Sequence, residues 1–140
     1  MFTSTTEPSG IMVMKDGIES NLNEKNMKEN IKKLVRTLLE AVIKSGEAGI
    51  HNGILDRHLR MVEDQYSNVE FGLKLLVELE SDDRDFNYYE LGEVLNDSTD
   101  VDDVELSIHR MLDYYSCVTK TKCDFTEEEI KELAHCCEHQ

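Results

Sequence analysis

The chain has 140 residues, with 15 Lys and Arg against 30 Asp and Glu and a formal net charge of −15. That length allows one domain or two very small lobes. So large an excess of carboxylates repels nucleic-acid phosphates and anionic lipid headgroups, which argues against direct nucleic-acid binding and membrane-surface binding. A basic partner suits the charge better.

Composition also bears on compartment and fold class. No apolar run approaches the roughly 20 residues that a membrane-crossing helix needs, and the first ten residues lack the basic start and apolar centre of a signal peptide. We therefore expect a soluble, intracellular protein of the cytoplasm. One proline, seven glycines and few aromatic residues are typical of an all-α protein.

The N-terminal part divides into a tail and a first helix. Residues 1–25 are polar without helical or strand period, which predicts a flexible N-terminal tail followed by a single helical domain over 26–140. Asn26 and Glu29 have the spacing of a capping box, and apolar residues then recur at steps of three and four. The segment 45–49 contains two glycines and predicts the end of this helix.

Five further helices complete the prediction, making about six helices paired as helix-loop-helix hairpins. Their predicted ranges are 52–63, 67–79, 87–95, 100–115 and 126–137. Capping boxes predict three of the starts, with the pairs Ser67/Glu70, Asn87/Glu90 and Thr126/Glu129. Asp100 is the predicted cap of the fifth helix.

One apolar residue stands late in the predicted loop of each hairpin. These residues are Ile50, Phe86 and Phe125, separated by 36 and 39 residues. A period in this range indicates repeated supersecondary units. The pattern resembles the EF-hand superfamily, whose helix-loop-helix unit recurs at about that interval. An unrelated helical bundle is the alternative, because capping boxes and amphipathic hairpins occur in any bundle.

The second hairpin carries the closest resemblance. Its loop from Glu80 to Glu90 is similar to the shortened loop of the penta-EF-hand group, and the loop before Glu129 resembles a pseudo EF-hand. By that resemblance, a candidate weak calcium site consists of Asp82, Asp83, Asp85, Asn87 and Glu90. No loop combines alternating oxygen ligands with the glycine of the sharp turn. We therefore expect calcium independence and no cofactor.

The resemblance implies a scaffold that grips an amphipathic, usually basic, helix of a partner protein. An apolar groove would supply affinity and the acidic surface would select a cationic target. The predicted partner-binding residues are Glu80, Asp82, Asp83, Asp85, Asp100, Asp102 and Asp103. The main hypothesis is a non-enzymatic protein-binding module with a regulatory or adaptor role. The alternative is an acidic inhibitor that imitates nucleic acid, as anti-restriction and anti-CRISPR proteins do.

Cysteines and histidines gather in the last quarter of the chain. They are Cys117, Cys123, His135, Cys136, Cys137 and His139. Adjacent Cys136 and Cys137 point about 100° apart on a helix and no Cys-x-x-Cys pair occurs, which argues against zinc. We expect reduced thiols, with a disulfide to the last helix as the alternative. Nothing in the spacing brings a cysteine to His109, so no enzyme is predicted. The partner's identity and the oligomeric state stay open.

Overall fold

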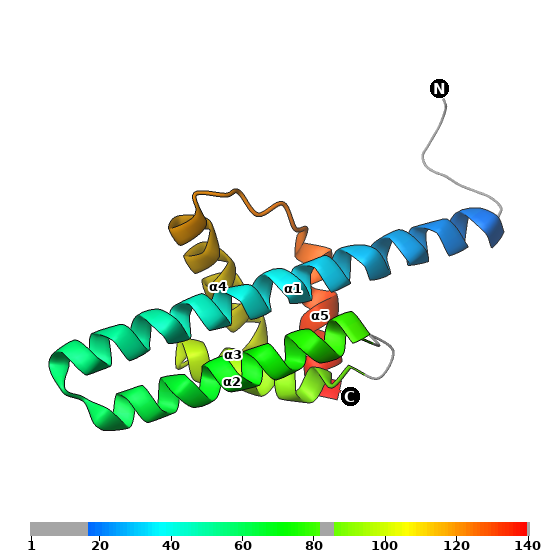
Figure 1. Ribbon diagram of the computed structural model, residues 1–140. Helices are drawn as coiled ribbons and strands as arrows, with labels where there is room; N and C mark the ends of the chain where they lie inside the picture. Colours follow the sequence, from blue (N-terminus) through cyan, green and yellow to red (C-terminus); the bar gives the residue numbers. More distant parts are fainter. Residues whose placement is uncertain (1–16, 82–85, 140) are drawn as a thin grey trace. The chain divides into compact units, whose positions relative to one another are not determined.

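The computed structural model describes residues 17–81 and 86–139, with side chains from residue 28 onward. Within these ranges it has five α-helices and no strand, which confirms the all-α class (Figure 1). The helices are α1 (Gly17–Asp56), α2 (Leu59–Ser81), α3 (Tyr88–Thr99), α4 (Val104–Thr119) and α5 (Glu127–His139). The chain divides into two compact units, 1–31 and 32–140, and the contacts below lie within the second. None of the helices in the described ranges has both the length and the apolar character needed to cross a bilayer.

The first two helices end at places that differ from the prediction. α1 continues through the predicted stop at 45–49, and α2 continues through the predicted turn at 64–67. The break lies at Arg57, which has a left-handed φ of 60°. Its N–H donates to the Ile54 carbonyl at 3.2 Å, and the His58 N–H donates to the Gly53 carbonyl at 2.8 Å. These two bonds form a Schellman motif, which satisfies carbonyls at the end of α1.

Glycines inside α1 pack against α2 and do not end the helix. A Cβ added to Gly46 would overlap the Val69 side chain, and one added to Gly53 would lie 2.7 Å from the Val62 Cγ2. On the other helix, a Cβ on Gly72 would meet Ile43 at 3.1 Å. The prediction of glycine punctuation is therefore wrong here. Because these glycines have no side chain, the two helices can run side by side as a close antiparallel hairpin (Figure 1).

The first predicted EF-hand-like unit does not form, because Ile50 lies inside α1. α1 also begins at Gly17, within the predicted tail, so that Asn26 is a helical residue and caps no helix start. The predicted order of helix, loop and helix holds for α2 with α3 and for α4 with α5. Phe86 is buried in the connection between α2 and α3, two residues before α3 begins.

The core of the second unit draws on every helix. α3 packs against α2, α4 and α5, and α4 packs against α5. The largest apolar side chains with less than 2% exposure fill the interior: Leu34, Val35, Leu38, Leu39, Val42, Leu75, Leu79, Phe86, Leu91, Leu95, Ile108 and Leu133. This burial is the main favourable contribution to stability.

The starts of α3, α4 and α5 follow the predicted caps with one correction, whereas Ser67, predicted to cap a helix with Glu70, lies inside α2 and caps no helix start. Thr126 and Glu129 form a reciprocal capping box: the Thr126 N–H donates to Glu129 Oε1 at 2.9 Å, and the Glu129 N–H donates to Thr126 Oγ1 at 3.1 Å. α4 is capped by Asp103, whose Oδ1 accepts from the Leu106 N–H at 3.2 Å. Asp100, the predicted cap, instead ends α3 in a left-handed conformation with φ of 56°.

Candidate functional site

Glu80, a predicted partner-binding residue, joins the two helices of the hairpin. Arg36 Nε donates to Glu80 Oε1 at 2.7 Å, and both side chains are partly exposed. The hydrogen bond from Arg36 lowers the pKa of Glu80 below its ordinary value. The predicted residues Asp82, Asp83 and Asp85 lie outside the described residues.

Asn87 and Glu90, the other two members of the candidate calcium site, both take part in protein contacts. Asn87 caps α3, with its Oδ1 accepting from the Glu90 N–H at 3.0 Å. This confirms the predicted cap. The Glu90 carboxylate lies 3.5 Å from Lys74 Nζ of α2. A calcium ion binding there would have to compete with a helix cap and an ion pair.

The predicted acidic residues between α3 and α4 surround two helix ends. Asp102 and Asp103 are exposed, and the Asp103 side chain is the cap described above. The Asp100 N–H donates to the Asn96 carbonyl and so closes α3. Carboxylates near a helix N-terminus are stabilised by the helix dipole, which gives Asp102 and Asp103 a role in the fold.

All four cysteines are free thiols, and among the described residues none of them belongs to a group of three side chains that could hold a metal ion. Cys117 is exposed, whereas Cys137 is buried, and burial raises the pKa of the Cys137 thiol to about 12. Burial also raises the pKa of Cys136. A raised pKa leaves little thiolate, the nucleophilic and metal-binding form. The rings of His135 and His139 stack on α5 with centroids 4.4 Å apart.

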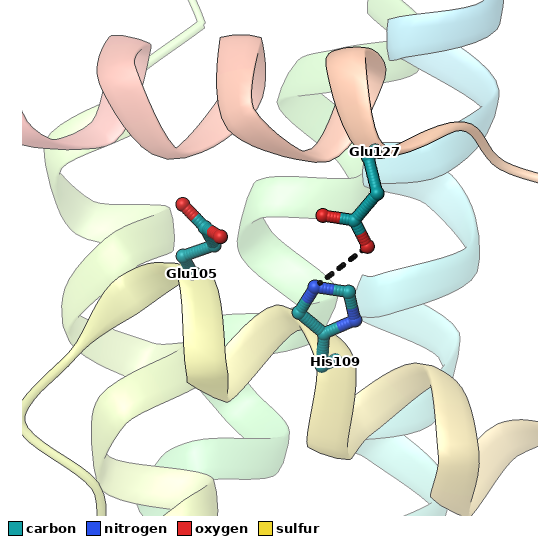
Figure 2. A group of neighbouring side chains, drawn as sticks. All are labelled: Glu105, His109 and Glu127. Carbon is teal, nitrogen blue, oxygen red and sulfur yellow. Dashed lines mark ion pairs between the residues drawn. The ribbon is translucent and has the colours of Figure 1, made fainter.

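A different group of side chains, of types that can bind a metal ion, does come together (Figure 2). Glu105 and His109 lie one turn apart on α4, and Glu127 is the first residue of α5. One ligand atom from each lies within 4.8 Å of the others, and His109 Nε2 is 3.3 Å from Glu127 Oε1. Glu105 and His109 are half-buried and Glu127 is exposed. Among the described residues no other such group of three occurs.

This group was not predicted from the sequence, where cysteines were the only nucleophiles or ligands suggested as partners of His109. The spacing of Glu105 and His109, four residues apart on a predicted helix, was a usable signal for one shared face. Glu127 had no local signal, since it reaches His109 only through the packing of α5 on α4.

The hairpin also exposes an apolar surface that was not predicted from the sequence. Four exposed side chains on α2, named the α2 stripe, recur at helical spacing: Leu59, Tyr66, Leu73 and Val77. Their exposed fractions are 75%, 57%, 48% and 65%. Helical periodicity puts the stripe on the side of α2 opposite the buried Leu75 and Leu79. Ile54 and Leu55 add exposed apolar surface at the end of α1.

Acidic residues border the α2 stripe. Glu63 lies four residues after Leu59, and Glu70 lies four residues after Tyr66, so each stands one turn along from a stripe residue. Both are exposed. The combination of exposed apolar side chains with a polar rim is typical of a protein-binding surface.

Two arrangements therefore stand out, the α2 stripe with its acidic border and the Glu105, His109 and Glu127 group. No family model, no curated protein and no solved structure matches this chain.

Proposed function

We propose that the chain is a non-enzymatic protein-binding module that holds an amphipathic, basic helix of a partner against the α2 stripe. The observation that carries the proposal is the row of four exposed apolar side chains on the side of α2 that faces away from the core. Contiguous exposed apolar surface is unfavourable in water and commonly marks a binding site. A regulatory or adaptor role would follow from such binding.

The spacing of the stripe favours a helical occupant. Leu59, Tyr66 and Leu73 are seven residues apart, and Val77 follows four residues after Leu73. A partner helix with apolar residues at steps of three and four could lie along this row. Tyr66 is the strongest anchor, because a tyrosine ring offers a large apolar face with a polar tip.

Charge favours a basic partner over a second copy of the chain. Glu63 and Glu70 border the stripe, and the whole chain carries a net charge of −15. Two copies paired through the stripe would bring these like charges together, which is unfavourable. Lys or Arg beside the apolar face of a partner helix would instead meet carboxylates and be drawn in by the overall field.

The test uses the full chain and two synthetic helical peptides of equal length, one with leucine on one face and lysine on the other, and one with glutamate replacing lysine. Fluorescence anisotropy measures binding. We expect the lysine peptide to bind and the glutamate peptide not to bind. Tyr66→Ala should weaken binding at least about tenfold, which corresponds to about 1.4 kcal/mol.

A matched control is Leu106→Ala, which removes an exposed leucine from α4 at 44% exposure. It should leave binding unchanged. The double change Glu63→Lys with Glu70→Lys should reverse the preference between the two peptides. Equal weakening by Tyr66→Ala and Leu106→Ala would refute the stripe as the site, and sedimentation of a dimer that Tyr66→Ala dissociates would point to a second copy as the occupant.

Two further measurements separate this proposal from its rivals. A calorimetric calcium titration should give no saturable heat, and peptide binding should not change with calcium. Displacement of nucleic acid from a basic DNA-binding protein at low salt, unaffected by Tyr66→Ala, would favour the nucleic-acid mimic. Asp102 and Asp103, exposed beside the start of α4, are the residues to change next in that case.

A further inference from the structure

We propose that Glu105, His109 and Glu127 bind a zinc ion that joins α4 to α5. The three side chains come from two helices and bring one nitrogen and two carboxylate oxygens together (Figure 2). This site is independent of the α2 stripe and uses none of the cysteines.

The distance between His109 and Glu127 suits a tetrahedral ion. Ligands about 2.1 Å from zinc in a tetrahedron stand about 3.4 Å from one another. His109 Nε2 and Glu127 Oε1 are 3.3 Å apart, and the Glu105 carboxylate lies within 4.8 Å of both ligand atoms. Closing the set to tetrahedral spacing requires the Glu105 carboxylate to move nearer to the other two ligand atoms.

The kind of ligand selects the metal. An imidazole nitrogen with two carboxylates suits zinc and neighbouring transition metals, whereas calcium and magnesium prefer oxygen ligands throughout. Three protein ligands leave a fourth tetrahedral position for water or for a group from another molecule. A cation between Glu105 and Glu127 would also offset the repulsion between two carboxylates whose oxygens lie within 4.8 Å of each other.

Helix caps and core packing constrain the backbone near the three proposed ligand residues. Asp103 caps α4 two residues before Glu105, and the Thr126 and Glu129 capping box encloses Glu127. Ile108 and Ile130, next to the site in sequence, are buried in the core. Ligands on fixed helix starts lose little backbone freedom when a metal binds, which raises affinity.

The experiment titrates metal-free, reduced full-length protein with zinc in competition with a chromogenic chelator. We expect one site per chain and at least about a tenfold loss of affinity in His109→Gln and in Glu127→Gln. Zinc should raise the melting temperature of the wild type and not of His109→Gln, because a ligand stabilises only the state that binds it. Circular dichroism of each metal-free variant checks that it folds.

The matched control is the double change His135→Gln with His139→Gln, which removes the stacked histidine pair of α5. It should leave zinc affinity within about twofold, since neither ring belongs to the proposed site. Cobalt in place of zinc gives a second readout, because thiolate ligands produce a charge-transfer band and a nitrogen and oxygen set does not. Loss of binding in the histidine-pair variant, a thiolate band, or no saturable binding would each overturn the proposal.

Discussion

Gly46 of α1 lies so close to Val69 of α2 that a Cβ at position 46 would overlap the Val69 Cγ2 methyl group. The backbone carbonyl of Gln65 would be 3.2 Å away on another side. Since this carbonyl belongs to a helix, it cannot move aside as a flexible side chain can. The contact between Gly46 and Val69 therefore limits the distance between α1 and α2 at this point of the hairpin.

The first prediction is that Gly46→Ala destabilises the fold, although alanine is the better helix former by about 1 kcal/mol. Overpacking costs about 1–3 kcal/mol and should exceed that gain. Urea unfolding measures the difference. Adding Val69→Ala, which removes the obstructing methyl groups, should recover stability in a double-mutant cycle. Gly49→Ala is the control, because it meets only the movable Gln65 side chain; equal losses at 46 and 49 would contradict the argument.

The second prediction concerns Arg57, which holds a left-handed conformation at the turn between α1 and α2. Such a conformation costs a residue with a Cβ about 1–2 kcal/mol, and glycine recovers most of it while losing more backbone entropy on folding. Arg57→Gly should therefore stabilise the chain by up to about 1 kcal/mol in thermal unfolding. Arg60→Gly, in the first turn of α2, should instead destabilise by up to about 1 kcal/mol. Destabilisation by both would show that the turn does not strain Arg57.

The third prediction follows from the lowered pKa of Glu80. A carboxyl whose pKa is lower in the folded state adds stability above its unfolded pKa, near 4.5, and loses it as the pH falls through the folded value. The wild type should therefore exceed Glu80→Gln in stability at neutral pH, and the difference should vanish in acid. Urea unfolding at a series of pH values measures this. Arg36→Gln should give the same profile, and a difference that persists in strong acid would rule out the ion pair as its source.

The fourth prediction ranks the cysteines by reactivity. Raising the pKa of Cys137 from 9.0 to about 12 lowers its thiolate fraction about a thousandfold near neutral pH. Iodoacetamide should therefore alkylate the exposed Cys117 first and Cys137 last in the folded protein. Peptide mass spectrometry follows each site. In denaturant the two rates should converge; fast labelling of Cys137 without denaturant would contradict its burial.

The sequence predicted the fold class and the later helices because their signals are local. Asn87 and Thr126 stand at helix starts with a glutamate three residues on, and both caps form as expected. The end of α1 and the start of α2 were predicted wrongly because no glycine stands at the turn between these helices. Arg57 takes the left-handed conformation there. Gly46 and Gly53 lie inside α1, where they allow side chains of α2 to pack closely against the α1 backbone. A glycine that allows close helix packing can be told from one that ends a helix only when the position of α2 is known.

The candidate sites were less predictable for a related reason. Charge alone pointed to Glu80 and Asp103, yet these side chains make an ion pair and a helix cap. The α2 stripe could not be separated from core residues by hydropathy, because α2 carries apolar side chains on both its buried and its exposed sides. Knowing which side faces the core requires the position of α3.

Burial along the hairpin falls off from one end to the other, since Leu38 and Leu75 are fully enclosed whereas Ile54 and Leu59 are mostly exposed. Local opening should therefore need little free energy near the turn and much more near the core. Amide hydrogen exchange would be fast around the turn and slow toward Leu75. A helix bound along the stripe would slow exchange over the same stretch, so this gradient would report directly where a partner sits.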